Sequence, residues 1–105
     1  MSDTITLVRL RLQEGKSPTE WLKVNEKINA WAKRQPGFRF RSLSEADDGE
    51  WIIMSYWESV EAAAAAETRF GAEMMGMCEP LILPGSVSMS QSKAHLMQRG
   101  QEGAR

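Results

Sequence analysis

The sequence predicts an α+β domain of the ferredoxin-like class: a βαββαβ chain whose four-stranded antiparallel sheet carries both helices on one face. Four segments have the composition or alternation of strands, two longer segments have helical periodicity, and they follow one another in the order β-α-β-β-α-β. Each helix lies within a crossover long enough to obey the right-handed rule, which places both on the same face. The expected elements span residues 4–12, 18–34, 38–43, 51–57, 59–77 and 86–92.

The first strand and first helix follow from local pattern. Residues 4–12 alternate between an apolar side and a mixed side. The Ser-Pro-Thr-Glu sequence at 17–20 marks a helix start, because the serine hydroxyl can accept a hydrogen bond from a free backbone N–H. Proline at the first helical position costs no hydrogen bond, because the N–H that it lacks would have no partner within the helix. Pro36 and Gly37 end this helix. Its apolar stripe consists of Trp21, Val24, Ile28, Trp31 and Ala32, with Asn25 at the edge.

A β-hairpin is expected next. Residues 38–43 alternate phenylalanine with arginine, and the Ala-Asp-Asp-Gly-Glu cluster at 46–50 is typical of a turn. Residues 51–57 are bulky at both parities. This composition predicts a strand buried on both faces and leaves open which parity faces the helices.

The second helix begins at Ser59 and extends to about Met77, with Gly71 as a weak point because glycine is a poor helix former. A carboxylate, Glu67, falls within its apolar stripe. The last strand, at 86–92, alternates apolar residues with four serines. The stripe of the second helix consists of Val60, Ala63, Ala64, Phe70, Met74 and either Met77 or Cys78.

Composition is that of an ordinary soluble globular chain, with 42% hydrophobic and 26% charged residues. At 105 residues we expect a single domain at 1–92 and a polar tail at 93–105. The net charge of −1 provides no basic surplus for a nucleic acid or an acidic membrane. No apolar run approaches the roughly 18 residues of a membrane span, and the N-terminus lacks the basic and apolar regions of a signal peptide.

Metal and disulfide chemistry have few ligands available. Cys78 and His95 are the single cysteine and histidine, which excludes an internal disulfide and a cysteine-based zinc site. The chain is poor in transition-metal ligands for the same reason. We therefore expect no metal, and a reducing, cytoplasmic setting.

Strand alternation assigns two faces to the sheet. The face opposite the helices carries Arg9, Arg11, Arg39 and Arg41, together with the serines at 86, 88, 90 and 92. The helix-facing set consists of Val8, Leu10, Leu12, Phe38, Phe40, Val87 and Met89.

Three motifs carry a family resemblance. They are the Arg-Leu-Arg-Leu run at 9–12 with Gly15 after it, the Pro-Gly-Phe at 36–38, and the Trp-Glu-Ser at 57–59 that precedes an alanine-rich helix. On these motifs the chain resembles the antibiotic biosynthesis monooxygenase-like group of the dimeric α+β barrel superfamily. The resemblance implies that two sheets pack face to face, so that the arginine-bearing face forms a homodimer with its arginines paired or solvated at the barrel ends.

The resemblance also implies a pocket between sheet and helices, and cofactor-independent monooxygenation of a small aromatic, quinol or polyketide-like compound. Other members of the group degrade haem. Those members use an asparagine on the first strand and a tryptophan and a histidine on the second helix, where gap-free counting finds Val8, Ala66 and Gly76. Haem degradation is therefore not expected. Quinol-oxidising relatives often carry histidines in the helix after Trp-Glu-Ser, and this helix has none.

Glu67 is the candidate catalytic residue. A carboxylate on a buried stripe has a raised pKa unless a cation pairs with it, and such a base could take a proton from a phenol or an activated C–H. Alternatively, Glu67 reaches a basic residue at the pocket rim or points to solvent. We expect Asn25 and Tyr56 as polar helpers. The expected aromatic-binding wall, whose members could equally be core residues, consists of Trp21, Trp31, Phe40, Phe70 and Met74.

Two other functions stay open. One is a non-catalytic homodimer that binds a small ligand or has a structural role, its pocket filled by its own side chains. The other is a platform for single-stranded nucleic acid, which would place Trp51 and Trp57 beside the arginines on an exposed sheet. The absence of a basic surplus and of the glycine-aromatic signature of RNA-binding sheets argues against this platform.

Overall fold

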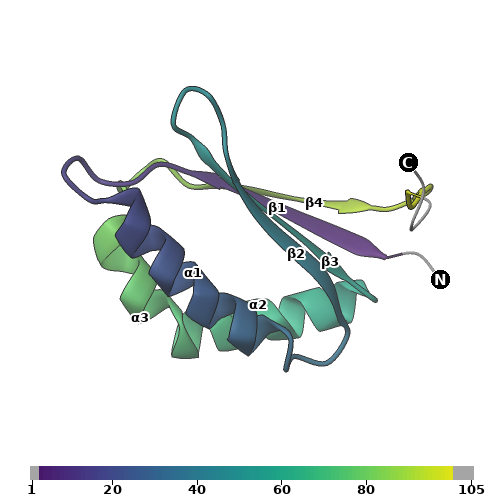
Figure 1. Ribbon diagram of the computed structural model, residues 1–105. Coiled ribbons are helices and arrows are strands. Elements are labelled where there is room, and N and C mark those ends of the chain that lie inside the picture. Colours follow the sequence, from purple (N-terminus) through teal and green to yellow (C-terminus); the bar gives the residue numbers. More distant parts are fainter. Residues whose placement is uncertain (1–2, 101–105) are drawn as a thin grey trace.

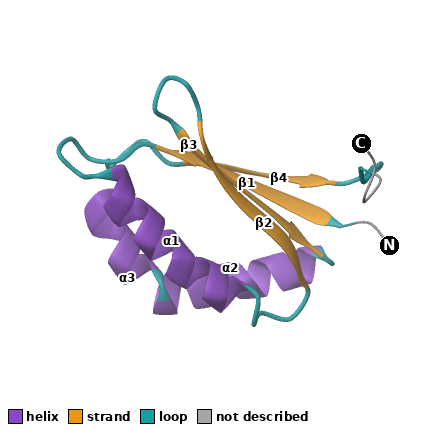
Figure 2. Cartoon of the chain, in the orientation of Figure 1, coloured by secondary structure: helices purple, strands orange, loops and turns teal. Residues whose placement is uncertain are grey.

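The computed structural model describes residues 3–100, which form a four-stranded antiparallel sheet with the helices packed on one face (Figure 1). The sheet order is β2-β3-β1-β4, and the opposite face carries no helix (Figure 2). This is the predicted ferredoxin-like arrangement. The elements are β1 (Thr4–Leu10), α1 (Pro18–Ala32), β2 (Phe38–Glu45), β3 (Trp51–Trp57), α2 (Val60–Glu73), α3 (Met75–Cys78), a 3-10 turn (Glu79–Leu81) and β4 (Ser88–Lys93).

The predicted element starts are confirmed where local chemistry sets them. Ser17 caps α1 by accepting the backbone N–H of Glu20 at 3.0 Å, and Ser59 caps α2 by accepting that of Ala62 at 3.0 Å. The hairpin turn is closed by backbone hydrogen bonds between residues 46 and 50 and between 46 and 49. The last strand begins at Ser88, two residues later than predicted. Residues 101–105 of the predicted tail lie outside the described residues.

The second helix departs from its prediction in two ways. It ends at Glu73, where Met74 adopts φ −119°, and a short α3 follows; Gly71 lies inside the helix and does not break it. Its buried stripe is also rotated, because Ala63 and Ala66 are buried whereas Val60 and Ala64 are exposed. Residues 62–66 are all alanine, so their identities carry no information about which side of the helix is buried.

A β-bulge in β2 changes the faces of two neighbouring residues. Phe38 pairs with Trp57 and Phe40 pairs with Tyr56, so Arg39 is the extra residue. Arg41 then lies opposite Ser55, on the helix side of the sheet, whereas Phe40 lies on the other face and is 51% exposed. The predicted placement of Phe40 toward the helices and of Arg41 away from them is therefore wrong.

The core lies between the helices and the inner face of the sheet. Trp51 and Trp57 of β3 are 5% and 6% exposed and belong to it, which settles the parity of this strand. The opposite parity of β3 (Ile52, Met54 and Tyr56) is only half-buried, so burial on both faces does not occur within the single chain. No helix among residues 3–100 is long and apolar enough to cross a membrane.

Gly37 sets how closely α2 approaches the start of β2. It has φ +82°, and a Cβ there would lie 2.6 Å from the Cβ of Ala62 and 2.9 Å from the Cγ of Glu58. The Gly37 carbonyl accepts the backbone N–H of Glu58 at 2.8 Å. Both the conformation and the close approach therefore require glycine at this position.

Candidate active site

A cavity of about 390 Å³ lies between the inner face of the sheet and the helices. Its volume falls within the range of small-molecule sites, which is about 300–1,000 Å³. All four strands, or the loops next to them, and all three helices contribute to it. The lining residues are Thr6, Val8, Leu10, Trp21, Ile28, Trp31, Ala32, Arg41, Ile53, Ser55, Trp57, Ala63, Ala66, Glu67, Phe70, Gly71, Met75, Cys78, Ile82, Val87 and Met89.

The cavity wall is mainly aromatic and aliphatic. Trp31 and Phe70 meet edge to face with their ring centroids 5.7 Å apart, the geometry that aromatic quadrupoles prefer. The Trp31 indole nitrogen donates to Glu73 Oε1 at 3.0 Å, which ties α1 to the end of α2. Such a wall suits a planar apolar or aromatic ligand.

Arg41 brings a positive charge to this wall. Its Nη2 donates to Asn25 Oδ1 at 2.7 Å and its Nη1 donates to Asn29 Oδ1 at 2.6 Å. Both partners are neutral amides, and no carboxylate among residues 3–100 forms an ion pair with Arg41. Burial lowers the pKa of Arg41 to about 10, so the guanidinium is still protonated at neutral pH.

Asn25 holds this arginine in place. The amide is 3% exposed, and its Nδ2 donates to the Trp21 carbonyl at 2.9 Å. That hydrogen bond orients the side chain so that its oxygen accepts from Arg41. The residue expected at the edge of a stripe is therefore a buried link between α1 and β2, although it does not itself line the cavity.

Two further polar groups are buried at the cavity. The indole nitrogen of Trp21 is buried without a hydrogen-bond partner among the described residues, although buried donors are normally satisfied. Cys78 is 1% exposed; burial raises the pKa of its thiol, and the charge of Arg41 lowers it by a smaller amount. The thiol is therefore neutral at pH 7.

Glu67 lines the cavity and is exposed, which agrees with the alternative that it points to solvent and not with its burial on the stripe. The rotated stripe of α2 explains this, because Ala63 and Ala66 take the buried positions and Glu67 lies one residue further round. It forms no hydrogen bond or ion pair with another residue in the range 3–100.

The other predicted pocket residues divide into two groups. Trp21, Trp31 and Phe70 line the cavity, whereas Phe40 and Tyr56 lie on the far face, where their rings meet edge to face at 5.9 Å. Met74 is buried in the core, and its neighbour Met75 takes the lining position. Arg41 and Ser55 were missed, the first because the bulge cannot be read from alternation. Within residues 3–100, no group of three or more His, Cys, Asp and Glu side chains could hold a metal ion.

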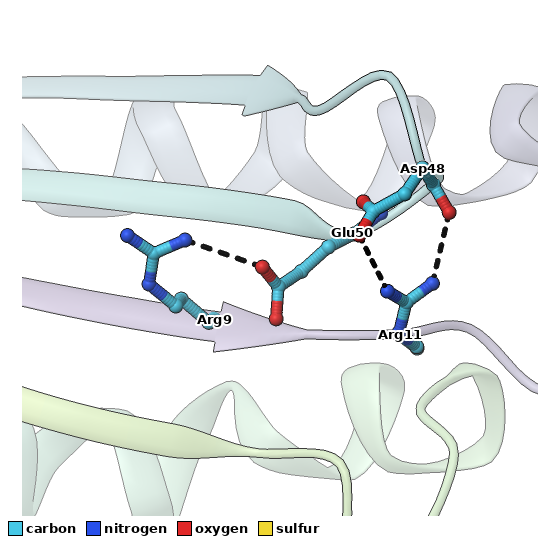
Figure 3. A network of polar contacts seen from close by, with 4 residues as sticks. All are labelled: Arg9, Arg11, Asp48 and Glu50. Atoms are coloured by element: carbon cyan, nitrogen blue, oxygen red, sulfur yellow. Dashed lines mark hydrogen bonds and ion pairs between the residues drawn. The ribbon is translucent and has the colours of Figure 1, made fainter.

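Three of the four arginines predicted to face away from the helices are paired with acids, and two of these pairs are drawn in Figure 3. Arg9 Nη1 lies 3.2 Å from Glu50 Oε1, and Arg11 contacts Asp48 through both its carboxylate and its carbonyl at 3.0 Å. Arg39 Nε lies 3.6 Å from Asp3 Oδ1. With these charges paired and with Trp51 and Trp57 in the core, the nucleic-acid platform loses both its cations and its stacking rings.

No family model matches the sequence, and no curated protein matches it. Solved structures do share its fold. SnoaB, a cofactor-independent oxygenase from Streptomyces nogalater, is 17% identical, with a TM-score of 0.73 over 99% of this chain and 100% of its own. The monooxygenase from the gene ActVA-Orf6 of Streptomyces coelicolor, in complex with nanaomycin D, is 17% identical, with a TM-score of 0.68 over 95% and 94%.

A candidate antibiotic biosynthesis monooxygenase from Caulobacter crescentus is 19% identical, with a TM-score of 0.73 over 90% of this chain and 92% of its own. At these identities the likeness shows a common fold. The resemblance to the antibiotic biosynthesis monooxygenase-like group, predicted from three short motifs, is confirmed at that level.

Proposed function

We propose that the cavity binds a small aromatic, quinol or polyketide-like compound and that the protein oxidises it with dioxygen, without a cofactor. One observation carries the proposal: an apolar cavity of about 390 Å³, walled by aromatic rings, has a guanidinium in its lining. Apolar walls with a few placed polar groups are the usual composition of a small-molecule site. The type of reaction proposed is that of a fold neighbour, SnoaB, which is described as a cofactor-independent oxygenase.

The proposed chemistry needs a base and a group that stabilises an anion. The Glu67 carboxylate, at the cavity, accepts the proton of an activated CH₂ group, and the Arg41 guanidinium stabilises the negative charge that develops on the neighbouring oxygen. The carbanion gives its electrons to dioxygen and, with one proton, forms a hydroperoxide. The O–O bond then breaks as the second C–H proton leaves. The balance is CH₂ plus O₂ giving C=O plus water.

Oxygen uptake tests the catalytic role of Glu67. Wild type, Glu67→Gln and Glu61→Gln are compared with anthrones and quinols as substrates; Glu61 is an exposed acid on the same helix that does not line the cavity. We expect Glu67→Gln to lose about 10²–10⁴-fold in rate, the usual contribution of a general base, and Glu61→Gln to keep the wild-type rate. Equal rates for wild type and Glu67→Gln would remove Glu67 from the mechanism.

The exposure of Glu67 favours a second candidate function, a protein that binds such a ligand without converting it. No hydrogen bond or ion pair from residues 3–100 holds the Glu67 carboxylate toward the cavity. This reading predicts that quinone-type ligands quench tryptophan fluorescence in the cavity while no oxygen is consumed with any substrate of the panel. Ligand-dependent oxygen uptake above the uncatalysed rate decides against it.

We propose further that the outer face of the sheet packs against a second copy of the chain. Ile5, Leu7, Met54 and Tyr56 form half-buried neighbours across β1 and β3 on that face, and the exposed Phe40 extends them onto β2. No element among residues 3–100 covers this apolar surface, and removing it from water on both chains of a dimer would be favourable. The occupant that the family resemblance implies is the same face of a partner chain.

Light scattering tests the dimer. Wild type is expected at twice the chain mass of 11.8 kDa, and Leu7→Glu at the mass of one chain, because a carboxylate would be buried without a partner. Leu22→Glu, an equivalent change at an exposed leucine of α1, is expected to remain dimeric. A monomeric wild type, or a dimeric Leu7→Glu, contradicts the proposed interface.

A further inference from the structure

We propose that Arg41 makes the cavity selective for ligands that carry an anionic oxygen on an aromatic skeleton, such as an ionised phenol or enol. The inference rests on the proposed function for the presence of a ligand, and it adds the charge state that the site recognises.

The first argument is the missing counter-charge. Arg9, Arg11 and Arg39 each have a carboxylate oxygen within 3.6 Å. Arg41, which the bulge turns toward the helices, has two amide oxygens in its place. Charges removed from water are normally paired, so a half-buried arginine at an apolar cavity, with neutral partners only, leaves its charge available to a ligand.

The second argument is that the guanidinium is held with donors to spare. Asn25 and Asn29 each accept one of its five N–H groups, which fixes the plane of the fork. The remaining donors can form paired, charge-assisted hydrogen bonds to an anionic oxygen. Apolar surroundings strengthen this attraction relative to water.

The test compares two ligands of nearly equal shape. 2-Hydroxy-1,4-naphthoquinone is an acidic enol and is anionic at pH 7, whereas its methyl ether is neutral. Dissociation constants are measured by quenching of tryptophan fluorescence. We expect wild type to bind the hydroxy compound at least about tenfold more tightly than the ether, because hydrogen bonds to charged groups are about twice as strong as neutral ones.

Four variants assign that preference to Arg41. Arg41→Met is expected to bind both ligands equally, and Arg41→Lys to recover part of the preference because it keeps the charge. Asn25→Asp supplies the missing counter-ion at a buried position, so it should also abolish the preference. Asn29→Asp also places a carboxylate against Arg41, so it should reduce the preference as well. Leu22→Glu is the control: it adds an acid at an exposed position of the same helix that does not line the cavity, so the preference should remain. Circular dichroism and thermal unfolding show whether each variant folds, and Asn25→Asp carries the test if Arg41→Met does not.

The outcomes separate this inference from the proposed oxidation. A tenfold preference that depends on Arg41, seen without oxygen uptake, supports the inference and removes the oxidation. Oxygen uptake with the same ligand preference in wild type and Arg41→Met overturns the inference and leaves the oxidation standing. Failure of wild type to bind the hydroxy compound more tightly than the ether also overturns the inference.

Discussion

Replacement of Gly37 by alanine should destabilise the fold by more than a change of backbone conformation alone explains. With φ +82°, any residue other than glycine costs about 1–2 kcal/mol. The new Cβ would also lie 2.6 Å from the Cβ of Ala62, which is fixed to the backbone of α2 and cannot rotate away. Overpacking of this kind costs about 1–3 kcal/mol, so we expect a total loss of about 2–5 kcal/mol in the free energy of unfolding.

Gly15→Ala is the matched control for this change. Gly15 has φ +86°, and a Cβ there would meet nothing within 4 Å. It should therefore lose only the conformational part, about 1–2 kcal/mol. Urea unfolding measures both variants, and the midpoint of thermal unfolding should fall by about 4–8 °C for each kcal/mol lost in a domain of this size.

A double variant isolates the contact itself. Ala62→Gly alone costs up to about 1 kcal/mol in helix propensity. Combined with Gly37→Ala, it removes the contact between the two Cβ atoms and leaves only the 2.9 Å contact with the flexible Glu58 side chain, so the double variant should lose less than the sum of the two single losses by about 1–3 kcal/mol. The reasoning is refuted if Gly37→Ala is no less stable than Gly15→Ala, or if the two changes at the contact are additive.

Three further predictions follow from the caps and the titrating groups. Ser59→Ala should lower the free energy of unfolding by about 1 kcal/mol through loss of the α2 cap, whereas an exposed serine of β4 changed to alanine should leave it unaltered in urea unfolding. Because burial raises the pKa of Cys78 and the charge of Arg41 opposes this, the pH profile of Cys78 alkylation should have a midpoint above that of a free thiol, and Arg41→Met should move it higher still; an unchanged profile contradicts the coupling. The backbone N–H of Glu50 and, to a smaller extent, Arg11 lower the pKa of Asp48. The contribution of Asp48 to stability is therefore present at neutral pH and is lost as the pH falls through the lowered pKa. Carboxyl NMR of Arg11→Gln should show the Asp48 midpoint rising only part of the way to its ordinary value, and a complete return would show that Arg11 is the main cause.

The elements could be predicted because local chemistry determines them. The serine caps, the turn at 46–50 and the bounds of β3 depend on neighbouring residues, and the structure agrees with each. The cavity was placed between sheet and helices by family resemblance, and three of the predicted aromatic residues line it.

The charge in the cavity could not be predicted, because it depends on a property that alternation does not encode. Strict alternation puts Arg39 and Arg41 on one face of β2, but the bulge separates them. In α2, five consecutive alanines hide which side of the helix is buried, so the sequence left open whether Glu67 is buried or exposed. Both questions concern the rotation of an element about its axis. That rotation is decided by packing against distant segments, which the residues of the element do not record.

The bulge at Arg39 also affects how relatives of this protein should be compared. It determines whether Arg41 or Phe40 enters the cavity, and the two differ by a full positive charge. A relative with the same residues in β2 but an unbroken pairing would present a phenyl ring to its ligand in place of a cation. The ligand preference of such proteins can therefore change through the gain or loss of a β-bulge, although the amino-acid identities at the site stay the same.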